Sequence, residues 1–274
     1  AYLNNQPSGG TAPCHLTIDQ TGRYLFLANY LSGGLSVFPI EPDGRLSSAS
    51  SSVQHQGSSI DPIRQTGPHA HCVTLDFANR YLFAADLGID KIMVYRLNLT
   101  EGVLEPNDLP SVNLKAGAGP RHFVFHPNGN NAFVINELDS TLTSFNYDSS
   151  RGGLTEIETV STLPSDFTGT SSCADVHVSP SGRFVYGSNR GHDSIVIFEF
   201  DAITNRLNYL GHESTKGKRP RNFAIDPTGN FLLAANQDTD TIVTFRIDKN
   251  TGRLEATGGI VKASMPVCLK MASF

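Results

Sequence analysis

Residues 124–137, VFHPNGNNAFVINE, contain a short apolar run, a Pro-Asn-Gly turn and a second apolar run, which is the pattern of a β-hairpin. Four more versions of this hairpin occur along the chain, at residues 17–30, 74–86, 177–190 and 224–237. We take the turn residue of each copy as its anchor. The five anchors, 47 to 57 residues apart, are Gly22, Asn79, Gly129, Gly182 and Gly229. The chain therefore consists of five related units.

Each unit continues beyond its hairpin in the same way. A third apolar run follows, such as SIVIFEF at residues 194–200, and a Leu that opens a fourth run lies 24 or 25 residues after each anchor. Gly, Asn and Asp separate the runs, and no stretch shows helical periodicity. Four short strands in each repeat predict an all-β protein, a β-propeller built of four-stranded blades. Five complete blades are visible, and we expect them to be part of a seven-bladed ring.

The two ends of the chain predict an incomplete blade. Residues 1–5 precede the first complete unit and are predicted to be an outer fourth strand, while residues 266–272 are predicted to be the first strand of a further unit. We therefore expect residues 1–274 to form a single propeller domain that lacks its N-terminal blades. A natural five-bladed ring is the alternative.

Composition limits the possible partners. The net charge is −5, the isoelectric point is about 6.0 and only 17% of residues are charged, so no basic surface for nucleic acid is expected. No apolar run is long enough to span a membrane, and residues 1–10 show no secretion signal, which predicts a cytoplasmic location. The sequence does not specify an oligomeric state. The cysteines lack metal-ligand spacing and are expected to be reduced thiols; they are Cys14, Cys72, Cys173 and Cys268.

The five copies can be aligned with one another, and one position hardly varies. Seven residues after the anchor, at position +7, every unit has Asn or Asp. A residue that recurs in this way performs the same local task in each blade, and we expect a side-chain hydrogen bond that ends the strand. The residues at position +7 are Asn29, Asp86, Asn136, Asn189 and Asn236.

Two other positions, −8 and +8, vary from unit to unit, and several units carry a charged or titratable residue there. Positions −8 and +8 lie at the same end of the hairpin, so both are predicted to open on one mouth of the central channel. Position −8 is also expected on the same strand face as the apolar residues at −6 and −4. The charged and titratable residues at these positions are His71, Arg121, Glu137, Arg190 and Arg221. Burying such groups is costly unless they pair or bind a ligand.

Two interpretations of this set stay open. Salt bridges among Arg121, Glu137 and Arg190 could hold neighbouring blades together. Alternatively, the arginines outnumber the carboxylate, which suits a small anionic molecule bearing a carboxylate or phosphate. His69 and His71 could in principle bind a metal, but no third ligand has suitable spacing, so no metal site is predicted.

Further residues are candidates for substrate contacts. Arg64 lies in the longest insertion, residues 50–67, which is expected to fold over the channel mouth. The predicted substrate-binding residues are Arg64, His69, His122, Asp175, Arg221 and Gln237.

Four motifs carry a resemblance to a known family: GPHAHCVTLD (67–76), GPRHFVFHPNGNNAFVINEL (119–138), SSCADVHVSPSGRFVYGSNR (171–190) and RPRNFAIDPTGNFLLAANQ (219–237). They resemble the lactonase-type seven-bladed β-propeller family, which includes bacterial 6-phosphogluconolactonases and fungal carboxy-cis,cis-muconate cyclases. The likeness extends through the whole chain. The motifs are specific to the family but do not distinguish its members by substrate.

The resemblance implies a metal-independent hydrolase that opens a sugar lactone in carbohydrate metabolism, in the pentose phosphate pathway, without a cofactor. A lactonising cycloisomerase is the runner-up, and a non-catalytic propeller that binds a protein or metabolite is the third hypothesis. The family's proposed catalytic set corresponds to His71, Arg121, Glu137 and Arg190. In that set Glu137 or neutral His71 would act as general base or acid, and the arginines would stabilise negative charge.

Overall fold

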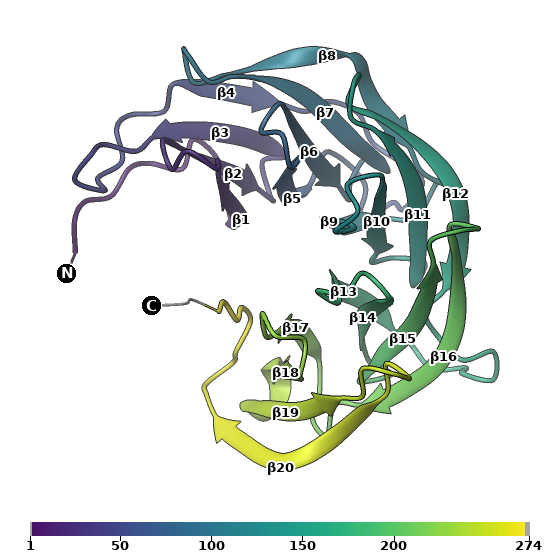
Figure 1. The fold of residues 1–274 in the computed structure, drawn as a ribbon. Coiled ribbons are helices and arrows are strands. Elements are labelled where there is room, and N and C mark those ends of the chain that lie inside the picture. Colours follow the sequence, from purple (N-terminus) through teal and green to yellow (C-terminus); the bar gives the residue numbers. More distant parts are fainter. Residues whose placement is uncertain (1, 272–274) are drawn as a thin grey trace. The chain divides into compact units, whose positions relative to one another are not determined.

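The computed structural model describes residues 2–271, which form five four-stranded sheets (Figure 1). A single 3-10 turn, η1 (Gln237–Thr239), is the one helical element assigned in this range. The strands, sheet by sheet, are β1 (Pro13–Ile18), β2 (Tyr24–Asn29), β3 (Gly34–Pro39) and β4 (Ser51–Gln54); β5 (Ala70–Leu75), β6 (Tyr81–Asp86), β7 (Lys91–Asn98) and β8 (Val103–Asn113); β9 (Pro120–Phe125), β10 (Asn131–Asn136), β11 (Thr141–Asp148) and β12 (Gly153–Ser161); β13 (Ser172–Val178), β14 (Phe184–Arg190), β15 (Ser194–Asp201) and β16 (Arg206–Ser214); β17 (Pro220–Ile225), β18 (Phe231–Asn236), β19 (Thr241–Ile247) and β20 (Leu254–Lys262).

In every sheet the strands lie in chain order, which confirms the predicted four-stranded repeat. Neighbouring strands are joined by short turns and run antiparallel, as β5–β6 and β13–β14 show. Leu104, Leu154, Leu207 and Leu254 all lie at the start of a fourth strand. Leu46 instead forms an isolated bridge with Ile40 ahead of the short β4. No helix among the described residues is long and apolar enough to cross a membrane.

The chain separates into two compact units. Unit 1 comprises Ala1–Phe123 with Tyr147–Leu154, and unit 2 comprises Val124–Asn146 with Thr155–Phe274. Unit 1 thus contains the sheets β1–β4 and β5–β8, and unit 2 contains β13–β16 and β17–β20. The boundary passes through the sheet β9–β12.

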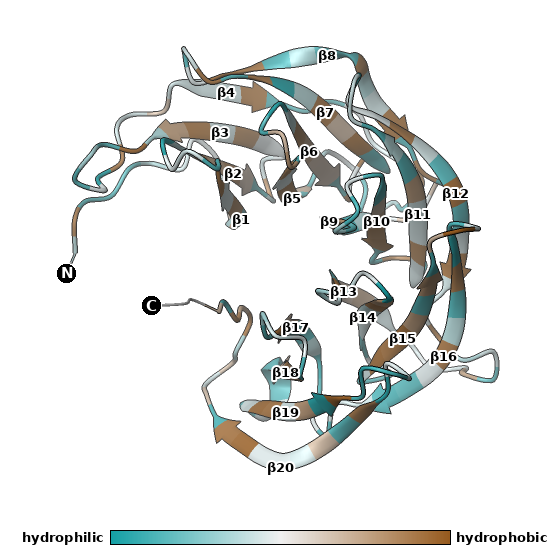
Figure 2. Ribbon diagram, viewed as in Figure 1, coloured by the Kyte–Doolittle hydropathy of each residue, from teal (hydrophilic) through white to brown (hydrophobic). Residues whose placement is uncertain are grey.

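The second strand of each sheet supplies much of the core. Every residue of β6, β10 and β14 is buried, and β6 and β10 are predominantly apolar in Figure 2. Within unit 1, β5 packs against β1 and β2; within unit 2, β17 packs against β13 and β14. The nearly continuous apolar sequence of the second strands follows from this burial on both faces.

The residues at position +7 are all buried, with at most 1% of their surface exposed. In three sheets the side-chain amide does more than end a strand, because it bonds the segment that leads into its own sheet, whereas Asn136 donates to Thr141 and Thr143 of β11. In unit 2, Asn189 Nδ2 donates to the Thr162 carbonyl at 2.8 Å and Asn236 Nδ2 donates to the Thr215 carbonyl at 3.0 Å. In unit 1, Asn29 Nδ2 donates to the Ser8 carbonyl at 3.0 Å. The predicted architectural role is confirmed.

Asp86 is the one acidic residue at position +7, and its partner differs accordingly. Asp86 Oδ2 lies 2.6 Å from Nδ1 of His55, with both side chains fully buried. Its other oxygen accepts the backbone amides of His69 at 2.7 Å and Gly88 at 3.0 Å. Asp86 therefore also fixes the segment that leads into His71.

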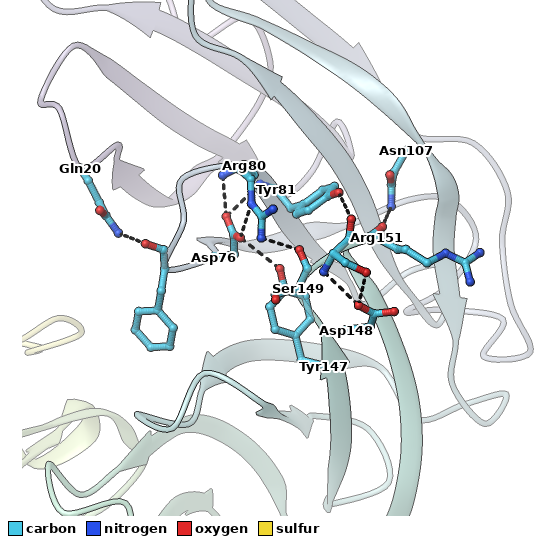
Figure 3. A network of polar contacts seen from close by, with 11 residues as sticks. Gln20, Asp76, Arg80, Tyr81, Asn107, Tyr147, Asp148, Ser149 and Arg151 are labelled. Carbon is cyan, nitrogen blue, oxygen red and sulfur yellow. Dashed lines mark hydrogen bonds and ion pairs between the residues drawn. The ribbon is translucent and has the colours of Figure 1, made fainter.

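A second contact joins neighbouring sheets at the turns. Figure 3 shows Asp76, Arg80 and Tyr81 facing the β11–β12 turn, all within unit 1. Tyr81 donates from its hydroxyl to the Ser150 carbonyl at 3.2 Å, and Tyr147 donates to Asp76 Oδ2 at 3.1 Å. Burial, followed by the charge of Asp76, raises the pKa of Tyr147 and keeps it a donor.

The turn glycine Gly152 lies flat against the Tyr81 ring. Its φ is +65°, and a Cβ at this position would lie 2.6 Å from the ring. Gly102 meets the Tyr24 ring, and Gly252 the Phe184 ring, in the same way. Glycine is required here because the aromatic side chain at the start of a second strand occupies the space that a Cβ needs.

The ends of the chain correct one expectation. Neither Tyr2–Asn5 nor Pro266–Met271 forms a strand among the described residues, while Ala1 and Ala272 lie outside them. A strand is defined by backbone-to-backbone hydrogen bonds with a partner strand, and these two segments form no such bonds within residues 2–271. Their place in a further blade stays a prediction.

The local geometry of Pro266–Met271 nevertheless repeats that of a first strand. Asp240 accepts the backbone amide of Met265 at 2.8 Å, as Asp90 accepts that of Gly119 just before β9 at 2.6 Å. Asn222 Oδ1 then accepts the amide of Leu269 at 2.6 Å.

The Gly152–Tyr81 contact predicts a steric penalty that can be separated from backbone strain. Gly152→Ala should destabilise the protein by about 3 kcal/mol, because it combines a left-handed alanine with a clash. Gly22→Ala is the matched control: its φ is +71°, and nothing lies within 4 Å of its added Cβ. It should cost about 1 kcal/mol. Denaturant unfolding measures both, and equal losses would show that Tyr81 imposes no steric constraint.

The hydrogen bond that Asn189 donates predicts that replacing its side-chain nitrogen by oxygen destabilises the protein. Asn189→Asp places a carboxylate against the Thr162 carbonyl, so the free energy of unfolding should fall by about 3 kcal/mol at pH 7. Folding favours the protonated acid, whose folded-state pKa is raised, so the deficit should shrink as pH falls. Exposed Asn208→Asp is the control and should change little. A deficit that is independent of pH would contradict this account.

Candidate functional site

In three sheets the residue at position −8 is the extra residue of a β-bulge. In β5 the pairing passes from Ala70↔Asp86 directly to Cys72↔Ala85, so His71 is the inserted residue. Cys14 in β1 and Arg221 in β17 are inserted in the same way. The expected alternation of position −8 with the apolar residues at −6 and −4 is therefore wrong, because a bulge interrupts it. A bulge redirects a side chain, which makes −8 a suitable place for functional groups.

In unit 1 the structure gathers aromatic and imidazole rings around His71, which is only 5% exposed. The His71 ring centroid lies 5.2 Å from that of His122 and 5.5 Å from that of Tyr30. Tyr30 stacks on His69 at 4.7 Å. Arg121, directly before His122 in β9, is 2% exposed. The predicted residues His69, His71 and His122 thus form one cluster.

The cluster includes two residues that sequence reasoning missed, Tyr30 and His15. Both could have been found, since Tyr30 occupies position +8 and His15 position −7 of the first unit. His15 Nδ1 accepts the Val73 amide at 3.3 Å, so its ring proton lies on Nε2, 3.8 Å from Cys72 Sγ. Burial acts to raise the pKa of Cys72, but the nearby His15 and its hydrogen bond hold that pKa below its ordinary value.

In unit 2 the structure brings together Glu137 and Arg190, the residues at +8 of neighbouring sheets. Arg190 Nη2 lies 2.9 Å from Glu137 Oε2, and the side chains are 6% and 7% exposed. The same nitrogen donates to the Cys173 carbonyl at 2.7 Å. A buried guanidinium thus orients the carboxylate, and removing either partner leaves a charge in a dry site.

Asp175 makes hydrogen bonds within the protein, and its role as a substrate contact stays a prediction. Its carboxylate accepts hydrogen bonds from Asn222 Nδ2 at 2.5 Å and from the Val176 amide at 3.0 Å, and it pairs with His177 Nε2 at 3.0 Å. These bonds link β13 to β17. Of the other candidates in unit 2, Arg221 occupies the β17 bulge. Gln237 Oε1 is buried and makes no hydrogen bond with the residues that the structure describes.

The predicted catalytic set is divided between the two units, with His71 and Arg121 in unit 1 and Glu137 and Arg190 in unit 2. Their meeting at a common ligand stays a prediction. All four cysteines are free thiols, as expected. Across residues 2–271, no cluster of three His, Cys, Asp or Glu side chains is arranged to hold a metal ion.

The chain is similar to proteins of one family. The model of the family "Lactonase, 7-bladed beta-propeller" matches residues 1–271. The chain is 41% identical over 225 residues to a 6-phosphogluconolactonase of Bacillus subtilis (strain 168), and 39% identical over 227 residues to one of Formosa agariphila. The alignments cover 82% of this chain but 63% and 64% of those proteins, so the chain spans somewhat less than two thirds of their length.

Among solved structures, the periplasmic gluconolactonase PpgL of Pseudomonas aeruginosa is similar to this chain, with a TM-score of 0.89 and 34% identity. The match covers 94% of this chain and 72% of that one.

The contacts of Asp175 predict a loss of stability without a loss of substrate affinity. In Asp175→Asn, an NH2 group replaces one carboxylate oxygen and faces groups that are themselves hydrogen-bond donors. The free energy of unfolding should fall by about 1–3 kcal/mol, and KM should not change. Asp201→Asn, in an exposed turn where the carboxylate also accepts backbone amides, is the control. A large rise in KM with an unchanged Tm would assign Asp175 to the substrate instead.

Proposed function

Because the chain belongs to the lactonase family of seven-bladed β-propellers, we propose that it hydrolyses a sugar lactone, with an anionic lactone of the 6-phosphogluconolactone type as substrate. The buried Glu137–Arg190 pair is the observation that supports this most directly. It supplies a carboxylate that can accept a proton, held in a fixed position by a permanent cation. The relatives named 6-phosphogluconolactonase support the substrate class.

The proposed reaction needs three contributions. Glu137 takes a proton from a water molecule, whose oxygen bonds to the lactone carbonyl carbon. Arg121 stabilises the negative charge that develops on the carbonyl oxygen, and Arg190 keeps Glu137 in position. The ring C–O bond then breaks, and the leaving oxygen receives a proton from His71. The product is the open-chain hydroxy acid. We propose that these groups act without a metal; this and the cytoplasmic location stay predictions.

Glu137→Gln tests this proposal, because it keeps the shape and an oxygen that can accept from Arg190 but removes the basicity. If Glu137 is the general base, kcat should fall roughly 100-fold or more, far beyond any loss of folded protein that the unneutralised Arg190 causes. The measurement is lactone opening above the spontaneous rate, together with thermal unfolding.

Glu199→Gln is the matched control. Glu199 pairs with Arg183 at 2.8 Å on the surface of β15, so its loss should affect neither activity nor, beyond about 1 kcal/mol, stability. If Glu137→Gln lowers Tm and its activity falls only in proportion to the unfolded fraction, the ion pair is architectural. A stable and fully active variant would remove Glu137 from the mechanism.

A further inference from the structure

The inserted loop between β4 and β5 has a fixed conformation. Gln65 within it is fully buried; its Nε2 donates to the Leu87 carbonyl at 2.8 Å, and its Oε1 accepts the Asp61 amide at 3.1 Å. Asp61 in turn accepts the amides of Ile63 and Arg64, both at 2.9 Å. Gln65 and Asp61 therefore hold the loop through side-chain and backbone hydrogen bonds.

This loop places Arg64 beside Tyr30, one of the rings clustered around His71 in unit 1. Arg64 Nη2 donates to the Tyr30 hydroxyl at 3.1 Å. The Tyr30 ring is itself fixed, since it stacks on His69 and its carbonyl accepts from His69 Nδ1 at 2.9 Å. Because Nδ1 donates to this carbonyl, the orientation of the His69 ring is fixed as well. Tyr30 also occupies position +8, the position of Glu137 and Arg190.

We propose that Arg64, positioned by Tyr30, binds the phosphoryl group of a phosphorylated sugar lactone. The inference rests on the proposed function and adds the residues that would distinguish phosphorylated from unphosphorylated lactones. A guanidinium matches a phosphate because its planar N–H groups form two parallel, charge-assisted hydrogen bonds. A single residue from an inserted loop can add this specificity without altering the sheets.

The test compares two substrates that differ only in the phosphate, 6-phosphogluconolactone and glucono-δ-lactone, using the full chain. Arg64→Gln should lower kcat/KM for the phosphorylated lactone roughly 10- to 100-fold, mainly through KM, and leave the other lactone nearly unchanged. Tyr30→Phe, which removes only the positioning hydroxyl, should raise KM for the phosphorylated lactone roughly fivefold. Arg64→Lys should fall between wild type and Arg64→Gln, because it keeps the charge but not the planar fork.

Arg96→Gln is the control for loss of an arginine. Arg96 is half exposed on β7 and pairs with Asp108 at 3.4 Å, so its replacement should leave both substrates unaffected. The ratio of the two kcat/KM values does not depend on the folded fraction, so a poorly folded variant still gives a result. An equal loss with both lactones, or a loss with neither, overturns the proposal for Arg64.

A binding experiment separates this proposal from the lactonase proposal. Calorimetric titration with 6-phosphogluconate and with gluconate should show that wild type prefers the phosphorylated acid and that Arg64→Gln loses the preference. If wild type opens neither lactone yet shows this pattern, the proposed function fails and the phosphate site stands. If wild type opens both lactones and Arg64→Gln keeps the preference, the function stands and the phosphate site fails.

Discussion

In three of the five sheets, a buried side-chain amide at the end of the second strand holds the segment that leads into that sheet. Within the units, Asn29, Asn189 and Asn236 donate to a carbonyl of the segment that precedes the first strand of their own sheet. Such a bond is made away from water, so breaking it leaves a polar group without compensation. The next residue along the chain is position +8. Fixing position +7 therefore fixes the backbone from which Tyr30, Glu137 and Arg190 project.

The residue type at position +7 differs in the sheet where its hydrogen-bond partner differs. Asp86 replaces Asn where the partner is an imidazole rather than a carbonyl, and the pair it forms with His55 is fully buried. The aromatic–glycine contact at the turns changes in a similar way. The third unit has Asn131 where the others have Tyr or Phe, and the corresponding turn residue of the next sheet is Asn205 rather than Gly. An aromatic ring and a turn glycine thus occur together and are replaced together.

These regularities explain how much the sequence could predict. The repeat of apolar runs determined the number and order of strands, and the constancy of position +7 indicated an architectural role, because both signals recur five times. The bulges could not be predicted from alternation, since one inserted residue leaves the apolar pattern on either side intact. Tyr30 is not among the predicted site residues, because its role depends on Arg64, which is 34 residues away and set by a loop that no repeat describes. Asp175 is predicted to contact substrate, and its hydrogen bonds to β17 are visible only in three dimensions.

The same division between constant and variable positions accounts for the range of substrates among the relatives. One relative of this chain is named a 6-phosphogluconolactonase and another a gluconolactonase, so the phosphate is the feature that differs between the two names. The scaffold is held in large part by position +7 and by the turn contacts, whereas the residues at −8, at +8 and in the loops differ from one sheet to the next. Arg190 is the last residue of β14 and Glu137 directly follows β10, so both project from backbone that the sheets constrain, which suits the bond-breaking step. Arg64 comes from a loop whose conformation is held by Gln65 and Asp61, so residue 64 can change without loss of those bonds, and recognition of a remote phosphate is the part of the task that can differ in this way.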